Sequence, residues 1–185
     1  MLIPFSKCNQ IIKACHGAGV KKILHVGAHT GEEALQYRAE AVEKVVWFEA
    51  NLDLLPALDE YISKFDMQHT IIPYALWDKN EILTFNITSN RQSSSFFDLQ
   101  THAEHYPEIV VSEKKKIQAY RLDTLIDRES SFIPFADFDF INIDTQGAEL
   151  AVLRGMGKHI RRPSIKGIYV EVNAERLYKG IPLVP

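Results

Sequence analysis

The segment from Ile23 to Leu35 contains, in immediate succession, an apolar run, a turn between two glycines and the start of a helix. Ile23–Val26 is the apolar run, and Gly27 and Gly31 frame the turn. The apolar spacing that follows Glu32 is typical of a helix. A strand, a tight loop and a helix N-terminus in this order form the nucleotide-binding corner of open α/β folds. The segment therefore predicts a Rossmann-like fold.

A second buried strand is predicted at Val45–Phe48, and the acid Glu49 follows it directly. An acid at the end of the second strand of such a fold can accept hydrogen bonds from both hydroxyls of a ribose. Two linked signals at this separation arise by chance much less often than one. We therefore expect a ligand that contains a ribose.

The glycine turn departs from the dinucleotide fingerprint G-x-G-x-x-G, because His29 and Glu32 stand where its second and third glycines would fall. A dinucleotide rests its pyrophosphate on the helix N-terminus. Glu32 and Glu33 would repel that anion and stabilise an empty helix start. S-adenosylmethionine, a sulfonium cation with a ribose and no phosphate, fits better, and Gly27 and Gly31 would let the backbone approach it closely. A nicotinamide-dependent oxidoreductase is disfavoured.

A second strand-to-loop signature repeats this logic further along the chain. Phe140–Ile143 reads as an apolar strand, and Asp144 follows its carboxyl end, where open α/β sheets bind their ligands. Gly147 then leads into a helix. The apolar positions of that helix, at about helical spacing, are Leu150, Leu153 and Met156.

These motifs together resemble the FkbM-type methyltransferases, which are class I S-adenosylmethionine-dependent methyltransferases. The resemblance extends from about Lys21 to Leu183, and its most specific part is the run Asp144–Glu149 followed by Leu153–Gly155. The segments that carry it are His25–Glu32, Phe48–Asn51, Arg121–Leu125, Ile143–Leu150, Leu153–Gly155 and Tyr169–Val172.

The resemblance implies a Rossmann-like three-layer α/β/α sandwich with a mostly parallel sheet. It also implies O-methylation of a sugar, glycan or small-molecule hydroxyl, with the loop near Ala75 beside the adenine. The residues expected to contact S-adenosylmethionine are Gly27, Ala28, His29, Gly31, Glu49, Ala50, Ala75 and Asp144.

An oxygen acceptor must lose a proton, which calls for a base. Asp144 is the first candidate because of its place at a strand end, and cofactor positioning or capping is its alternative role. His29 is a second candidate, although a loop histidine is more often structural. Glu149 lies in the first turn of a helix, where the dipole explains an acid equally well. The expected acceptor contacts are Gln146, Glu149, Glu171, Ser94 and Ser95.

Three of these acids, Asp144, Glu149 and Glu171, could hold a divalent ion, but no spacing requires one, and we predict no metal.

The chain has 185 residues, of which 46% are hydrophobic and 24% are charged, a length and composition that suit one domain, residues 1–185. Its net charge of −3 disfavours nucleic acid as a partner. No long apolar stretch or signal peptide indicates a membrane. With Cys8 and Cys15 expected to stay reduced, we predict a cytoplasmic protein.

Two stretches are harder to interpret. Residues 90–113 form the least regular region, and we expect part of the acceptor pocket there, since long irregular segments are often functional.

Gly167–Val172 is predicted as a fifth strand, and no later segment of the sequence is predicted to supply the last two strands of a complete class I methyltransferase. We therefore expect a C-terminally truncated domain whose open sheet edge could associate with a second copy as a homodimer. A non-catalytic binding or scaffold protein that keeps the fold is the alternative function.

Overall fold

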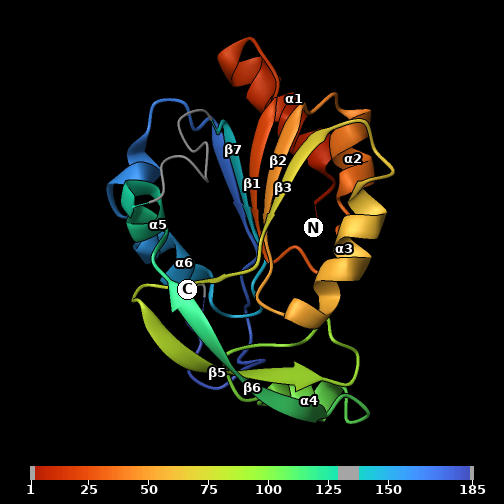
Figure 1. The fold of residues 1–185 in the computed structure, drawn as a ribbon, viewed down its shortest axis with the longest axis vertical. Helices are drawn as coiled ribbons and strands as arrows, with labels where there is room; N and C mark the ends of the chain where they lie inside the picture. Colours follow the sequence, from red (N-terminus) through yellow and green to blue (C-terminus); the bar gives the residue numbers. More distant parts are fainter. Residues whose placement is uncertain (1–2, 129–137, 184–185) are drawn as a thin grey trace.

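A parallel sheet of five strands forms the centre of the computed structural model, which describes residues 3–128 and 138–183. All neighbouring strands pair parallel, in the order β3-β2-β1-β7-β8. The strands are β1 (Lys22–Val26), β2 (Lys44–Phe48), β3 (Gln68–Ile72), β7 (Phe140–Ile143) and β8 (Gly167–Val170). The expected Rossmann-like α/β fold with a mostly parallel sheet is confirmed (Figure 1).

Helices cover both faces of this sheet, as Figure 1 shows. One face carries α1 (Phe5–His16), α2 (Ala34–Ala39), the 3-10 turn η1 (Leu52–Leu54) and α3 (Leu55–Ile62). The other face carries α5 (Leu122–Arg128), α6 (Glu149–Gly155) and the 3-10 turn η3 (Gly157–Arg161). The three layers of the predicted sandwich are therefore present.

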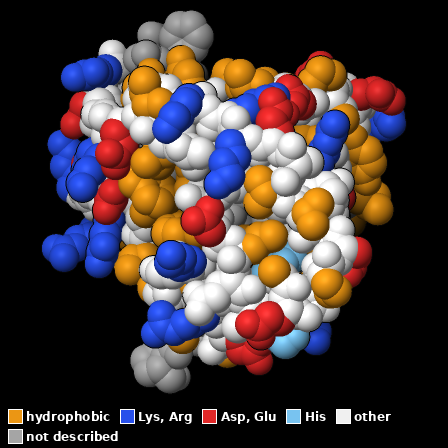
Figure 2. Space-filling model, turned by 90° about the horizontal axis from the view of Figure 1, so that it is seen from below, with side chains coloured by type: hydrophobic (Ala, Val, Ile, Leu, Met, Phe, Trp, Pro, Cys, Tyr) orange, Lys and Arg blue, Asp and Glu red, His pale blue; other side chains and the backbone are white. Residues whose placement is uncertain are grey.

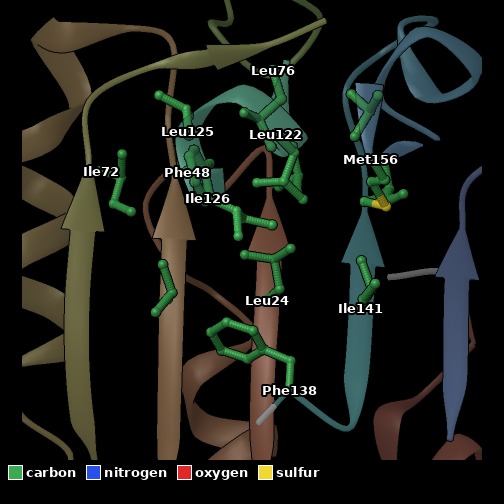
Figure 3. Packing of buried hydrophobic residues seen from close by; sticks show 14 residues of the cluster. Leu24, Phe48, Ile72, Leu76, Leu122, Leu125, Ile126, Phe138, Ile141 and Met156 are labelled. Atoms are coloured by element: carbon green, nitrogen blue, oxygen red, sulfur yellow. The ribbon is translucent and has the colours of Figure 1, made fainter. Parts of the chain in front are cut away.

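Two apolar cores result, one on each face of the sheet, because successive strand residues point to opposite faces. Leu24 of β1 packs with α5 and α6, whereas its neighbour Ile23 packs with α1, α2 and α3. Figure 3 shows the first core, in which Leu122 and Leu125 of α5 lie over Leu24. Burial of large side chains on both faces stabilises the sheet by about 1.5–3 kcal/mol per side chain.

A small second sheet lies beyond the carboxyl ends of the main strands (Figure 1). Its strand order is β4-β6-β5, and a short helix accompanies it. The elements are β4 (Ala75–Leu76), β5 (Glu81–Thr88), α4 (Thr101–His105) and β6 (Val111–Tyr120). Figure 2 views the molecule from this end, where apolar, acidic and basic side chains are interspersed.

Strand β5 contains apolar positions that alternate in part, Ile82, Leu83, Phe85 and Ile87, whereas the ten-residue strand β6 shows no such alternation around Lys114–Lys116. Lys114 and Lys116 are exposed, and Lys115 is half-buried. The irregular region is correspondingly shorter than expected.

The described part of the chain adds no strand after β8, which lies at the edge of the main sheet. The segment that follows begins at the carboxyl ends of the main strands and pairs there with the region around α4. Gln100 N donates to Leu177 O at 2.8 Å, and Lys179 N donates to Asp98 O at 2.8 Å. Within residues 3–128 and 138–183, no helix is both long and apolar enough to cross a membrane.

Candidate active site

Two adjoining pockets open at the carboxyl ends of the main strands. The inner pocket, of about 70 Å³, lies between these ends and the small sheet, and the outer pocket, of about 420 Å³, opens beside it. The apolar lining of the inner pocket comprises Leu54, Tyr74, Ala75, Leu76, Phe85 and Phe96. The two pockets share Gly27, His29, Gln92, Asp144 and Gln146.

The turn after β1 begins at Gly27, whose backbone has a φ of 85°. A Cβ at this position would lie 1.8 Å from the carbonyl oxygen of Asp144, so only glycine fits between β1 and the loop after β7. Gly31 also has a positive φ, but it faces Leu58 and Ile62 of α3 and lines neither pocket. It packs the turn onto a helix.

Glu49 follows β2 and lies in the inner pocket with 6% of its surface exposed. Its Oε2 accepts a hydrogen bond from His29 N at 2.7 Å, and its Oε1 accepts one from Asn51 N at 2.6 Å. Burial raises the pKa of Glu49, and these backbone donors oppose that rise. Two main-chain groups therefore fix the carboxylate in place.

His29 and Glu32 form a pair across the same turn. His29 Nδ1 lies 2.8 Å from Glu32 Oε1, and this contact raises the pKa of His29. Burial alone would raise the pKa of Glu32, but hydrogen bonds led by that from His29 lower it to about 2. Glu32 is therefore a carboxylate at neutral pH, and both side chains line the outer pocket.

Asp144 and Glu171, at the ends of β7 and β8, meet in the outer pocket. Gln146 Nε2 donates to Asp144 Oδ1 at 2.9 Å. Burial raises the pKa of Glu171, and the hydrogen bond and negative charge of Asp144 raise it further, to about 8. At neutral pH the Glu171 carboxyl group therefore keeps its proton beside Asp144.

Two of the expected acceptor residues hold loops instead of lining a pocket. Glu149 Oε1 accepts hydrogen bonds from Thr145 N, Thr145 Oγ1 and Gly147 N, and thus shapes the loop after β7. Ser95 Oγ donates to Gln146 O at 2.6 Å. Ser94, in contrast, lines the inner pocket.

The structure thus brings together most residues expected at the site. Those that line a pocket are Gly27, Ala28, His29, Glu49, Ala50, Ala75, Ser94, Asp144, Gln146 and Glu171. Gly31, Ser95 and Glu149 do not. The roles assigned to all of them stay predictions.

The sequence did not reveal several other residues of the site. The pockets are also lined by Leu54, Phe96 and Gln92. Tyr178 lines neither pocket, but its hydroxyl donates a hydrogen bond to Gln146. The apolar spacing of residues 52–62 could have indicated Leu54, since that helix begins directly after Glu49. No local pattern points to Phe96, Gln92 or Tyr178.

A parallel sheet with a glycine turn after β1 and a buried acid after β2 defines a Rossmann-like α/β fold. The family model of the methyltransferase FkbM domain matches residues 25–183. The chain therefore belongs to the FkbM methyltransferase family, and the resemblance seen in its motifs is confirmed.

No curated protein matches the chain significantly. Among solved structures it is similar to the YcgJ protein from Bacillus subtilis, with 14% sequence identity and a TM-score of 0.27. That match covers 40% of this chain and 35% of the other. A similarity of this size says nothing about activity.

Proposed function

We propose that this protein uses S-adenosylmethionine to methylate a hydroxyl group of a sugar, a glycan or another small molecule. The observation that carries the proposal is the position of Glu49. Its carboxylate is fixed in the small, largely apolar inner pocket, which adjoins the larger acidic outer pocket. An adenosine with a cationic tail has the matching chemistry.

The inner pocket suits adenosine. Its apolar lining, including Leu54 and Leu76, fits the faces of an adenine ring. Each oxygen of Glu49 accepts one backbone hydrogen bond and can accept another, so both ribose hydroxyls can donate to it. The ring and the ribose would therefore bind as one unit.

The outer pocket suits a cation and not a phosphate. Of the described residues that line it, four carry carboxyl groups, and none is Lys or Arg. Glu32 and Glu33 precede α2 at the point where a dinucleotide would place its pyrophosphate. The sulfonium and ammonium groups of S-adenosylmethionine are attracted by these acids, whereas NAD is repelled.

Methyl transfer needs little more from the protein than alignment and a base. Bound S-adenosylmethionine supplies an electrophilic methyl group. Asp144 lies beside Glu171 in the outer pocket and can accept the proton of an acceptor hydroxyl. His29 is held by Glu32, so we assign it a positioning role within the turn.

Calorimetric titration of the whole chain with S-adenosylmethionine, S-adenosylhomocysteine and NAD tests the cofactor. We expect micromolar binding of S-adenosylmethionine, weaker binding of S-adenosylhomocysteine, which lacks the sulfonium charge, and no binding of NAD. Added salt should reduce the difference in affinity between S-adenosylmethionine and S-adenosylhomocysteine, because it screens the charges of the acids in the outer pocket. Binding of NAD alone would refute the proposal.

Transfer of a labelled methyl group to a panel of methyl glycosides then tests the reaction. We expect label on a hydroxyl oxygen of at least one acceptor. Binding of S-adenosylmethionine with no transfer to any hydroxyl compound would favour the alternative, a non-catalytic binding protein.

A further inference from the structure

The side chain of Gln146 is held at both ends of its amide. Its Nε2 donates to Asp144 Oδ1 at 2.9 Å, and its Oε1 accepts from the hydroxyl of Tyr178 at 2.9 Å. The backbone of Gln146 has a φ of 54°, and its carbonyl oxygen accepts from Ser95 Oγ. This side chain therefore links Asp144 to a residue that lies outside both pockets.

The two partners of the Gln146 amide differ in what they can do. An ionised Asp144 carboxylate can only accept, so the amide nitrogen faces Asp144 and the amide oxygen faces Tyr178. The Tyr178 ring has no exposed surface, and burial raises the pKa of Tyr178, so the hydroxyl keeps its single proton. That proton is directed to Gln146 Oε1 at 2.9 Å, with Ser93 O as a second, longer contact at 3.2 Å.

Tyr178 is itself held by the segment that connects β5 and β6. Leu99 pairs with Tyr178 as an isolated bridge, and the His102 ring lies 5.7 Å from the Tyr178 ring. His102 Nε2 also lies 3.0 Å from Ser93 Oγ. A distant part of the fold thus reaches Asp144 through two consecutive hydrogen bonds.

We propose that Tyr178 is a positioning residue, which through Gln146 fixes the orientation of the Asp144 carboxylate, the group that takes the proton of the acceptor. Glu171, after the adjacent strand β8, lies beside Asp144 and forms a hydrogen bond with it. The other titratable groups that act on Asp144 or Glu171 are Glu149 of α6 and His25 of β1. The catalytic part of this inference rests on the proposed function, whereas the hydrogen-bond chain does not.

The test compares Tyr178→Phe with Tyr120→Phe in the whole chain, by NMR. Tyr178→Phe keeps the buried ring and removes only the hydroxyl. We expect the Gln146 side-chain amide protons to exchange about 2- to 10-fold faster, as befits the loss of one hydrogen bond. We expect the titration of the Glu171 carboxyl to move as well, because Asp144 becomes free to rotate.

Tyr120→Phe is the matched control, since Tyr120 is half-buried and lies against Tyr74, away from Gln146. It should change neither signal. Unchanged amide exchange and Glu171 titration in Tyr178→Phe would overturn the proposal. If that variant does not fold, Gln146→Leu breaks the same chain with Tyr178 in place, and an unmoved Glu171 titration there would overturn it equally.

Calorimetry with S-adenosylmethionine separates this inference from the proposed function. Tyr178 lines neither pocket, so affinity for the cofactor should stay within about 2-fold in Tyr178→Phe. On an acceptor found with the labelled methyl group, kcat should fall while KM is kept. A wild-type chain that binds no S-adenosylmethionine refutes the proposed function, and the NMR signals then still decide whether Tyr178 positions Asp144.

Discussion

The inner and outer pockets hold their acids in different ways. In the inner pocket, both oxygens of Glu49 accept hydrogen bonds from main-chain N–H groups, those of His29 and Asn51. In the outer pocket, Asp144 is held by the side chain of Gln146 and faces the carboxyl group of Glu171. Main-chain donors are fixed by the fold, whereas side chains can rotate and exchange protons.

This difference indicates what each pocket is for. A carboxylate fixed by the backbone suits a part of the ligand that is the same in every turnover, such as a ribose. A carboxyl group that keeps its proton at neutral pH, next to a second carboxyl group, suits a step in which a proton moves. The three predictions that follow test this division of labour.

The largest effect is expected where the two pockets meet, at Gly27. In Gly27→Ala, the new Cβ would lie 1.8 Å from Asp144 O, and the φ of 85° would be strained. We expect a loss of more than about 2 kcal/mol in the free energy of unfolding, measured with denaturant, and loss of binding in both pockets.

Gly17→Ala is the control for Gly27→Ala. Gly17 has a similar φ of 75°, but its Cβ would meet no atom within 4 Å. The free energy of unfolding of Gly17→Ala should therefore fall by only about 1–2 kcal/mol, the cost of a left-handed backbone at a residue with a Cβ. Equal losses in the two variants would contradict the tight contact between β1 and the loop after β7.

An intermediate effect is expected for Glu49→Ala in the inner pocket. Affinity for S-adenosylmethionine, measured by calorimetry, should fall more than about tenfold with the loss of two charge-assisted hydrogen bonds to the ribose. Stability should fall by about 1–3 kcal/mol, because His29 N and Asn51 N lose their acceptor. Glu43→Ala, at the exposed start of the same strand, should change neither quantity. Full affinity in Glu49→Ala would refute the ribose assignment.

The smallest effect is expected from the proton in the outer pocket. Glu171 has a pKa raised from 4.5 to about 8, so the folded state binds more protons than the unfolded state between these values. Its contribution to stability is therefore complete below about pH 4.5 and is lost as the pH rises through 8. Urea unfolding from pH 5 to 9 should show this decline in the wild type.

Glu171→Gln should remove that part of the decline, since a glutamine cannot titrate. His25 works in the opposite direction, because burial lowers its pKa and its contribution is lost as the pH falls below 6.5. His25 is present in both proteins, so the difference between their curves isolates Glu171. Parallel curves would mean that the pKa of Glu171 is not raised in the folded state.

Local patterns in the sequence predicted the strands of the main sheet and the residues at their ends. The apolar run before Gly27 and the acid after Phe48 are each part of a pattern that spans only a few adjacent residues. Gly27, Glu49 and Asp144 are accordingly placed as expected, because the carboxyl ends of parallel strands meet at one edge of a sheet.

The same reasoning overlooked residues whose role depends on partners far along the chain. Strand β6 carries three consecutive lysines, and only its pairing with β5 makes it a strand. Glu149 looked like an acceptor contact, but its oxygen is taken by the loop it follows. Tyr178 lies 32 residues beyond Gln146 in a stretch without periodic pattern.

The sequence by itself determined the parallel sheet, the glycine turn and the acids at the strand ends, because these follow from apolar periodicity and from steric limits on a few adjacent residues. The tertiary structure alone decided how each acid is held: Glu49 by the backbone, Asp144 through Gln146 and Tyr178. Hydrogen bonds need partners within about 3 Å, and for residues distant in the chain only the packed fold sets that distance.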